Sequence, residues 1–458
     1  MPSGLGIRAR RLEVGISQFK FAELAGVTSA VLSAWELGKA DPKWEHEEQI
    51  LRTLVKLEAM VASGDYVKAK KRGTGNAGKR RRSREYSADR DPRSLPAASA
   101  DAPTVLAAFS GCGGMSEGFR MAGYSVEGFI EIVPEARATF ALNFPGARCL
   151  GEDIRDLDEA RLRRQLGSTH IDILAGGPPC QGFSLAGKRD RADPRNQLFR
   201  QLLKLADIVN PTVIVMENVR LLLSMKDPDG GLVVDRILDE MADHGFDATV
   251  SVVNAQDYGV PQFRERVIII ATNRDSGMGA VRFPAPTHGD PAAAPDLLPY
   301  RTFREATSDL APLESGDVCP DDHLHWAVEH PEHVLKWLRP VPEGRSAHDN
   351  DDLELRPPSG YNTTYKRLRW DEPASTIGTT FGMISASRNV HPQYTRSLTV
   401  REAMRLQTFP DDYVFEGKWG PIRTMIGNAV PPLLATALAR HLAESSQILL
   451  KYPACRLN

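Results

Sequence analysis

The sequence Ile171-Asp-Ile-Leu-Ala-Gly-Gly-Pro-Pro-Cys180-Gln-Gly-Phe-Ser184 contains a single cysteine directly after a rigid turn. The apolar residues that begin it predict a buried strand, and the strand ends at Gly-Pro-Pro. Pro178 and Pro179 fix their own φ angles and disfavour helical geometry before them, so the backbone that carries Cys180 is stiff. A stiff backbone suits a nucleophile, which must be held at attack distance. Because a lone cysteine is more often buried and inert, this interpretation needs a second observation.

A second strand-like run, Pro211-Thr-Val-Ile-Val-Met-Glu217-Asn218-Val219, also ends in polar residues. In an open α/β sheet, ligands bind at the carboxyl ends of the strands. We therefore expect the thiol of Cys180 and the carboxyl group of Glu217 to face one crevice.

The residues from Val105 to Ala122 predict a strand, a glycine loop (Ser110-Gly-Cys-Gly-Gly114) and a helix. Such a loop lets backbone N–H groups approach a polar ligand. A second predicted strand ends in Glu131, twenty residues beyond Gly111, where an acid can accept hydrogen bonds from a ribose. Asp153 follows the next short segment and is placed to hold the exocyclic amine of an adenine. This half of the sheet is expected to bind a nucleoside.

The composition is that of a soluble protein with two or three domains. The chain has 458 residues, of which 25% are charged and 41% hydrophobic, and no apolar run approaches the ~20 residues of a membrane span. The N-terminus lacks the pattern of a signal peptide, so we expect an intracellular location and no membrane partner. The five cysteines include no CxxC pair, which argues against disulfides and structural zinc.

The first 60 residues predict a small helical domain. The pattern from Ser17-Gln18 through Thr28 and Trp35-Glu36-x-Gly38 to Pro42 resembles the lambda-repressor-like helix-turn-helix family over residues 5 to 57. The resemblance implies that the segment after Gly26 lies in a DNA major groove, with Thr28 and Ser29 near phosphates. A dimerisation or protein-docking module is the alternative.

Residues 61–102 predict a flexible basic linker. From Lys68 to Arg93 there are eleven basic residues against three acidic ones, a net charge of +8. Such a tether binds phosphates without sequence preference, although a linker kept soluble by charge has the same composition.

Residues 274–390 break the alternation of strands and helices and predict an insert. Its histidines at 323, 325, 330 and 333 have no acid or thiol at firm metal-binding spacing, so we predict no metal site and a solvated amphipathic helix through Trp337. The ordered pattern resumes over residues 391–450, where Gly427-Asn428-Ala-Val-Pro-Pro432 is expected to open a long helix.

The motifs together resemble those of the DNA (cytosine-5) methyltransferases, in that family's order, over roughly residues 103 to 450. The matching segments are Phe109-Ser-Gly-Cys-Gly-Gly114, Glu131, Asp153, Gly177-Pro-Pro-Cys-Gln-Gly-Phe-Ser184, Glu217-Asn218-Val219, Gln262-x-Arg264-x-Arg266, Arg396-x-Leu-Thr-x-Arg401-Glu402 and Gly427-Asn428-Ala-Val-Pro. The resemblance implies an α/β fold: a Rossmann-like S-adenosylmethionine-dependent methyltransferase domain (103–273 and 391–450) and a smaller target-recognition domain (274–390), after the all-α helix-turn-helix domain.

The same resemblance assigns roles to individual residues. In the family's chemistry the Cys180 thiolate adds to C6 of a flipped-out cytosine while Glu217 hydrogen-bonds the base. The expected site residues are Cys180, Glu217, Arg264 and Arg266 for catalysis; Phe109, Gly111, Gly113, Gly114, Glu131, Asp153, Pro179 and Asn428 for S-adenosylmethionine; and Gln181, Ser184 and Gln262, with Thr28 and Ser29, for DNA.

The implied function is a restriction-modification methylase of the bacterial cytoplasm that acts on double-stranded DNA. A cognate restriction endonuclease and a helix-turn-helix pair on an operator of its own gene are the further partners expected. Three alternatives remain at this point. An amino-group DNA methyltransferase would carry an aromatic residue where this chain has Cys180, a tRNA cytosine-5 methyltransferase shares the thiol chemistry, and a purely regulatory DNA-binding protein would need no catalytic set.

Overall fold

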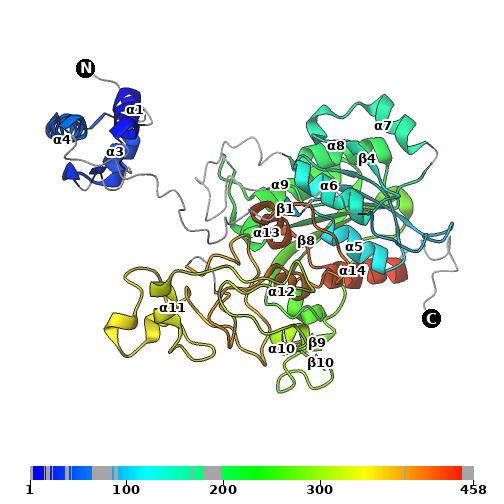
Figure 1. Cartoon of the computed structure of the whole chain (residues 1–458). Helices are drawn as coiled ribbons and strands as arrows, with labels where there is room; N and C mark the ends of the chain where they lie inside the picture. Colours follow the sequence, from blue (N-terminus) through cyan, green and yellow to red (C-terminus); the bar gives the residue numbers. More distant parts are fainter. Residues whose placement is uncertain are drawn as a thin grey trace. The chain divides into compact units, whose positions relative to one another are not determined.

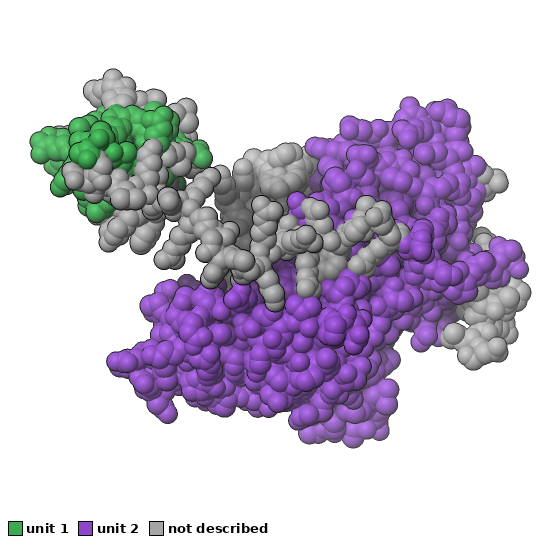
Figure 2. Space-filling view, in the orientation of Figure 1, with its two compact units in different colours: residues 1–82 green, residues 83–458 purple. Residues whose placement is uncertain are grey.

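The computed structural model describes residues 4–14, 16, 21–22, 24–36, 41–42, 44–63, 85–86, 91–167, 169–179, 198–227, 229–385 and 388–445. Cys180, Gln181 and Ser184 lie outside these residues. The chain divides into two compact units, residues 1–82 and residues 83–458 (Figure 2). Within the described ranges, no helix has both the length and the apolar character needed to cross a membrane.

The first unit is a helical domain around a small apolar core. Its helices are α1 (Gly4–Val14), α3 (Ser29–Glu36) and α4 (Trp44–Ser63), with further helical residues at 21–22 and 24. Buried Ile50, Leu54 and Leu57 share one face of α4 because they recur at helical spacing. A buried bidentate ion pair joins α1 to α3: Arg11 donates to both carboxylate oxygens of Glu36, at 2.6 and 2.9 Å. The predicted all-α domain is confirmed.

The second unit is organised on a seven-stranded sheet with the order β4-β3-β2-β5-β6-β8-β7. Figure 1 labels β4 and β8 of this sheet. The first five of these strands are parallel, and β8 pairs antiparallel with both β6 and β7. The strand order switches at β2 and β5, since β3 and β4 lie on one side of this pair and β6 on the other. In open α/β sheets, ligands bind at the carboxyl ends of the strands at such a switch point. The strands are β2 (Thr104–Ala108), β3 (Ser125–Ile130), β4 (Arg148–Gly151), β5 (Ile173–Gly176), β6 (Val213–Val219), β7 (Phe246–Asn254) and β8 (Glu265–Asn273).

Helices cover both faces of this sheet because its central strands are apolar on both sides. On β5, Leu174 points into the core that contains α7 (Glu159–Leu166), α8 (Phe199–Val209) and α9 (Val233–Asp243). Its neighbour Ile173 points into the opposite core with α5 (Gly114–Met121) and α14 (Pro432–Ser445). The predicted Rossmann-like α/β fold is confirmed.

A second lobe combines the insert with the segment after it. Phe303 and Leu324 of the insert share one core with Leu398 and Met404, and this core reaches Phe129 and Phe140 of the sheet domain. The helices here are α10 (Phe303–Thr307), α11 (Glu332–Leu338), α12 (Val400–Leu406) and α13 (Trp419–Asn428), with α6 (Pro134–Asn143) on the sheet side. The short strands are β1 (Glu85–Tyr86), β9 (His288–Gly289), β10 (Leu298–Pro299) and β11 (Gly417–Lys418). The 3-10 turns are Ile154–Asp156, Arg220–Ser224, Ala255–Tyr258, Arg274–Ser276, Ala347–Asp349 and Leu353–Leu355.

Three expectations from the sequence need correction. The linker was predicted to run over residues 61–102, but within this range β1 pairs with β11 and Arg93 is buried in the second unit. Gly427 and Asn428 end α13 and do not open the final helix, which begins at Pro432. Two of the insert's histidines, His325 and His330, are buried, whereas the prediction placed them on a solvated helix.

Candidate functional site

The glycine loop lies between the carboxyl end of β2 and the start of α5. Phe109, Gly111 and Gly113 all have positive φ, at 51°, 54° and 94°. Glycine adopts this conformation at little cost, whereas Phe109 is strained there, as residues at ligand sites often are. A Cβ on Gly113 would lie 2.6 Å from the Phe144 ring, and one on Gly114 would lie 2.4 Å from the Val430 carbonyl oxygen. Gly113 and Gly114 are therefore packed too closely against Phe144 and Val430 to accept a side chain.

Glu131 fastens this loop to the end of β3. Its two carboxylate oxygens accept one backbone N–H each, from Gly111 and from Val133, both at 2.8 Å. The side chain is buried, and burial raises its pKa while the two N–H groups oppose the shift. Each oxygen keeps a second lone pair that can accept a hydroxyl. Nearby, the Ser110 hydroxyl oxygen is buried and has no hydrogen-bond partner in the described structure.

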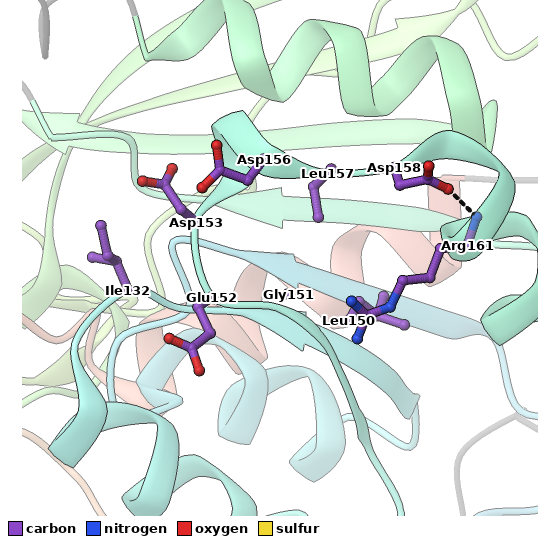
Figure 3. Close-up of a pocket in the computed structure, with 9 residues that line it drawn as sticks. All are labelled: Ile132, Leu150, Gly151, Glu152, Asp153, Asp156, Leu157, Asp158 and Arg161. Carbon is purple, nitrogen blue, oxygen red and sulfur yellow. Dashed lines mark hydrogen bonds between the residues drawn. The ribbon is translucent and has the colours of Figure 1, made fainter.

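A pocket of about 330 Å³ opens beside Glu131, at the carboxyl end of β4 (Figure 3). Ile132 and Leu157 give it apolar walls, and four carboxylates and one arginine supply its charge: Glu152, Asp153, Asp156, Asp158 and Arg161. Asp153 accepts hydrogen bonds from the backbone N–H and the guanidinium of Arg155, both at 2.9 Å, and the guanidinium bond lowers its pKa. An acidic pocket repels phosphate groups, so it suits a nucleoside that lacks them.

The second half of the site lies at the carboxyl ends of β5 and β6. Asn218 donates to the Pro178 carbonyl oxygen at 3.0 Å, which ties the Gly-Pro-Pro turn to β6. Arg266 on β8 pairs through Nε with Oε1 of Glu217 at 2.9 Å, and both side chains are largely buried. Burial lowers the pKa of Arg266, and the charge of Glu217 opposes this shift. The other carboxylate oxygen, Oε2, faces Gly177, where a Cβ would lie 3.3 Å away. The structure therefore brings Glu217 beside the turn that leads to Cys180.

This arrangement agrees with the comparison to known families. Residues 104–444 match the family described as C-5 cytosine-specific DNA methylase, and residues 7–45 match the helix-turn-helix family. The chain belongs to the C-5 cytosine-specific DNA methylase family. Type II methyltransferase M.DdeI of Desulfomicrobium norvegicum is 33% identical over 377 residues, covering 74% of this chain and 88% of that protein. Type II methyltransferase M1.HphI of Haemophilus parahaemolyticus is 36% identical over 343 residues, covering 73% and 85%.

Solved structures show the same fold. A DNA modification methyltransferase encoded within an E. coli prophage superposes with a TM-score of 0.58 at 23% identity, covering 75% of this chain and 99% of that one. DNMT2 of Spodoptera frugiperda gives 0.51 at 17% identity, with coverages of 74% and 99%. The family match and the relatives at 33% and 36% identity, more than the shared fold, show that the chain is a cytosine-5 DNA methyltransferase with an N-terminal helix-turn-helix domain.

Two residues of the Gln262-x-Arg264-x-Arg266 motif, Gln262 and Arg264, are fully buried and bonded to other parts of the protein. Gln262 has no exposed surface, its amide nitrogen donates to the Leu406 carbonyl at 3.2 Å, and its oxygen accepts the Ile377 N–H at 2.8 Å. Its predicted contact with DNA is therefore not supported. Arg264 donates to three backbone carbonyls, those of Ile377, Gly427 and Ala429, at 2.9–3.0 Å. Burial lowers its pKa well below the usual range, although the charge of Glu217 opposes this shift. The hydrogen bonds of Arg264 connect the segment before β8 to the second lobe.

The other predicted residues lie in different settings. Asn428 is exposed at the end of α13, and Pro179 is partly exposed beside Glu217's strand. Cys180, Gln181 and Ser184 fall outside the described residues, so their placement stays a prediction. In the helix-turn-helix unit, the Thr28 hydroxyl accepts the N–H of Val31 at 3.3 Å and caps α3, which begins at Ser29.

The insert's histidines serve as internal hydrogen-bonding groups. His325 bonds Thr399 Oγ1 at 3.0 Å and the Ala311 carbonyl at 2.8 Å, while His330 accepts the Ser397 N–H at 3.1 Å. Within the described ranges, no group of three potential ligand side chains is arranged to hold a metal ion.

Sequence reasoning missed the residues that support the loop from behind. Tyr413 is fully buried and its hydroxyl donates to the Cys112 carbonyl oxygen. Ile132, directly after Glu131, forms an apolar wall of the pocket although more than half of its surface is exposed. The position of Ile132 next to Glu131 was a usable signal, whereas nothing near Tyr413 in the sequence indicates its contact with a loop 301 residues away.

Proposed function

We propose that the protein transfers the methyl group of S-adenosylmethionine to C5 of a cytosine flipped out of a specific duplex sequence. The observation that carries this proposal is the position of the Glu217 carboxylate. Its Oε1 pairs with Arg266, and its Oε2 lies beside Gly177, in the turn that leads to Cys180. A base that enters this crevice would meet a hydrogen-bonding acid and a thiol together.

The residues at the carboxyl ends of β2, β3 and β4 fit S-adenosylmethionine. Glu131 offers acceptors for ribose hydroxyls, and the unpaired Ser110 hydroxyl oxygen is available to a polar group of the ligand. The four acids around the pocket suit a cationic sulfonium compound and disfavour phosphorylated nucleotides such as NAD. When bound, this cofactor would supply an electrophilic methyl group.

The chemistry assigned to the chain's own residues is covalent activation of the base. The Cys180 thiolate forms a bond to C6 while N3 takes up a proton, and the Glu217 carboxylate accepts hydrogen bonds from this N3–H and from the amino group, so that electron density gathers at C5. After C5 has accepted the methyl group, loss of its proton restores the C5–C6 double bond and expels the cysteine. Arg266 acts by orienting Glu217 through Oε1, which leaves Oε2 for the base.

Cytosine C6 is shielded inside a duplex, so the target base must leave the stack. We assign the choice of target sequence to the insert of residues 274–390, because Glu131, Asp153, Cys180, Glu217 and Arg266 all lie outside it. The helix-turn-helix units of two chains are proposed to bind an operator of the protein's own gene, so that the amount of methylase in the cell would control its own synthesis. A cognate restriction endonuclease is the expected functional partner.

Bisulfite sequencing of DNA from cells that express the protein tests the reaction. We expect complete protection of cytosines in one short sequence, loss of this protection in Cys180→Ala, and full activity in the matched control Cys319→Ala. Methylation at C5 by the Cys180→Ala protein would refute the covalent mechanism. Footprinting the upstream region with and without residues 1–82 tests autoregulation, and identical footprints would refute it.

A further inference from the structure

Arg93 lies at the end of the basic segment that connects the two units, eleven residues before the stretch matched by the methylase family. By composition it is one of eleven basic residues in a predicted flexible linker. In the structure only 8% of its surface is exposed, and its side chain is enclosed by carboxylates and an aromatic ring. Burying an arginine costs free energy unless its charge is paired and its N–H groups are hydrogen-bonded, so the partners of Arg93 show what it stabilises.

The guanidinium makes a bidentate bond to Asp412, with Nε and one terminal nitrogen each 2.7 Å from a carboxylate oxygen. The other terminal nitrogen donates to Glu117 at 2.9 Å. Glu117 has no exposed surface and lies on α5, one turn after the glycine loop. The backbone N–H of Arg93 donates to the Leu142 carbonyl in the last turn of α6 at 2.7 Å.

These contacts lead directly to the backbone of the cofactor loop. Arg93 lies 5.6 Å from the centre of the Tyr413 ring, and the Tyr413 hydroxyl donates to the Cys112 carbonyl oxygen. That hydroxyl would be 2.8 Å from a Cβ on Gly113, so the Tyr413 side chain packs directly against the backbone of the loop. The Glu117 backbone N–H donates to the Gly113 carbonyl at 2.8 Å. Arg93 therefore fixes both supports of the loop, the first turn of α5 and the Asp412-Tyr413 segment.

We propose that Arg93 is a positioning residue for S-adenosylmethionine binding, supplied by the interdomain segment and acting through Glu117, Asp412 and Tyr413 on the Ser110–Gly114 loop. This inference rests on the proposed use of that loop for the cofactor. It gives the end of the basic segment a role in the catalytic unit that is separate from contact with DNA.

The test is calorimetric titration of S-adenosylmethionine into the full-length protein, together with kcat and KM for the cofactor and for DNA. Arg93→Ala should raise the Kd and KM of the cofactor by roughly 3- to 30-fold, with kcat at saturating cofactor and the KM for DNA unchanged. Arg93→Lys should be intermediate, because an ammonium can reach one carboxylate but cannot form the fork to Asp412.

The matched control is Arg274→Ala, which also removes a carboxylate pair (Asp247, 2.8 Å) and a carbonyl bond (Ala242, 3.0 Å), but at the opposite edge of the sheet. It should leave the cofactor Kd at the wild-type value. If Arg93→Ala does not fold, Asp412→Asn decides the question, because Asp412 is 61% exposed and its loss leaves Glu117 paired with Arg93 and Arg120. Asp412→Asn should raise the cofactor Kd less than Arg93→Ala does.

A folded Arg93→Ala or Asp412→Asn protein with the wild-type cofactor Kd would overturn the proposal. So would a parallel loss of affinity for cofactor and DNA, since that would indicate general destabilisation. Failure of the proposed function itself is distinguishable, because the wild-type protein would then bind no S-adenosylmethionine in the same titration.

Discussion

Replacing Glu131 by glutamine should weaken S-adenosylmethionine binding strongly although the side chain keeps its shape. Each carboxylate oxygen of Glu131 accepts a different backbone N–H, from Gly111 and from Val133. A glutamine amide has only one oxygen, so in either orientation its NH₂ group must face one of these N–H donors. The variant therefore loses the tie to the glycine loop or the tie to the residues after β3.

The size of the effect follows from the bond that is lost. A hydrogen bond to a charged acceptor contributes about 1.5–3 kcal/mol net. If the loop must be held for the cofactor to bind, the Kd should rise by roughly 10- to 150-fold, at about 1.4 kcal/mol per tenfold change. The direct ribose contacts proposed for Glu131 would add to this figure.

The pH dependence provides a second measure. Burial raises the pKa of Glu131 above the ordinary 4.5 of a glutamate. Only the ionised carboxylate can accept both N–H groups and the ribose, so cofactor affinity should be constant above the raised pKa and fall as the pH drops through it. In Glu131→Gln the affinity should be low and independent of pH over the same range.

Titration calorimetry of the two proteins across this pH range measures both effects. The control is Glu127→Gln on the same strand, where the carboxylate accepts from the Ser125 hydroxyl and from the guanidinium of exposed Arg148. It should bind the cofactor like the wild type. A folded Glu131→Gln protein with unchanged cofactor affinity would refute the assignment of this loop to S-adenosylmethionine.

Three further predictions concern packing, acid stability and the N-terminal unit. Gly118→Ala places a Cβ 2.4 Å from the Pro432 carbonyl oxygen and should lower unfolding free energy by about 1–3 kcal/mol in urea titration, whereas Gly146→Ala, with open space around it, should have no effect. Burial lowers the pKa of His391 from 6.5 to about 3, so unfolding takes up a proton and stability should fall as the pH drops below about 6.5. The His391→Asn variant keeps an acceptor for the neighbouring N–H groups, and its urea midpoint should vary less with pH than that of the wild type. The same pH dependence of the urea midpoint in both proteins would contradict this. Deleting residues 1–82 should leave sequence-specific methylation but reduce the salt dependence of DNA affinity by counterion release, and an unchanged slope in filter-binding assays would exclude the basic segment from DNA contact.

The sequence was sufficient for the part of the site built from strand ends. Glu131 directly follows β3, and Glu217 lies near the carboxyl end of β6. Parallel strands of an open sheet place their carboxyl ends at one edge. That rule predicts a crevice shared by Cys180 and Glu217, which stays a prediction because Cys180 lies outside the described residues. The ion pair of Glu217 with Arg266 was not predicted; it forms between the neighbouring strands β6 and β8, where Val219 lies opposite Arg266. Local patterns determine the positions of Glu131 and Glu217, so they can be read without the structure.

The Gln262-x-Arg264-x-Arg266 motif marks the limit of such reasoning. Its spacing predicts three polar side chains on one face, yet only Arg266 reaches Glu217. Gln262 and Arg264 precede β8 and bond to backbone groups at Ile377 and Gly427, more than a hundred residues away. No pattern near the motif reports which distant carbonyls will meet it. Gln262 and Arg264 therefore connect the segment before β8 to the second lobe, a role that only the folded structure reveals.

Arg93 illustrates the same limit from the other direction. Composition describes the basic segment as uniform, because a count of charges cannot tell a solvated arginine from a buried one. Arg93 differs from the other basic residues because the fold places two acids beside it. Glu117 lies in the first turn of α5 after the glycine loop, and Asp412 directly precedes Tyr413. Deletion of residues 1–82 preserves this anchor and deletion of residues 1–100 removes it. The two truncations lose the same helix-turn-helix unit, so a higher cofactor Kd in the longer deletion alone would locate the effect in residues 83–100, and equal Kd values would show that the catalytic unit holds its cofactor loop without the interdomain segment.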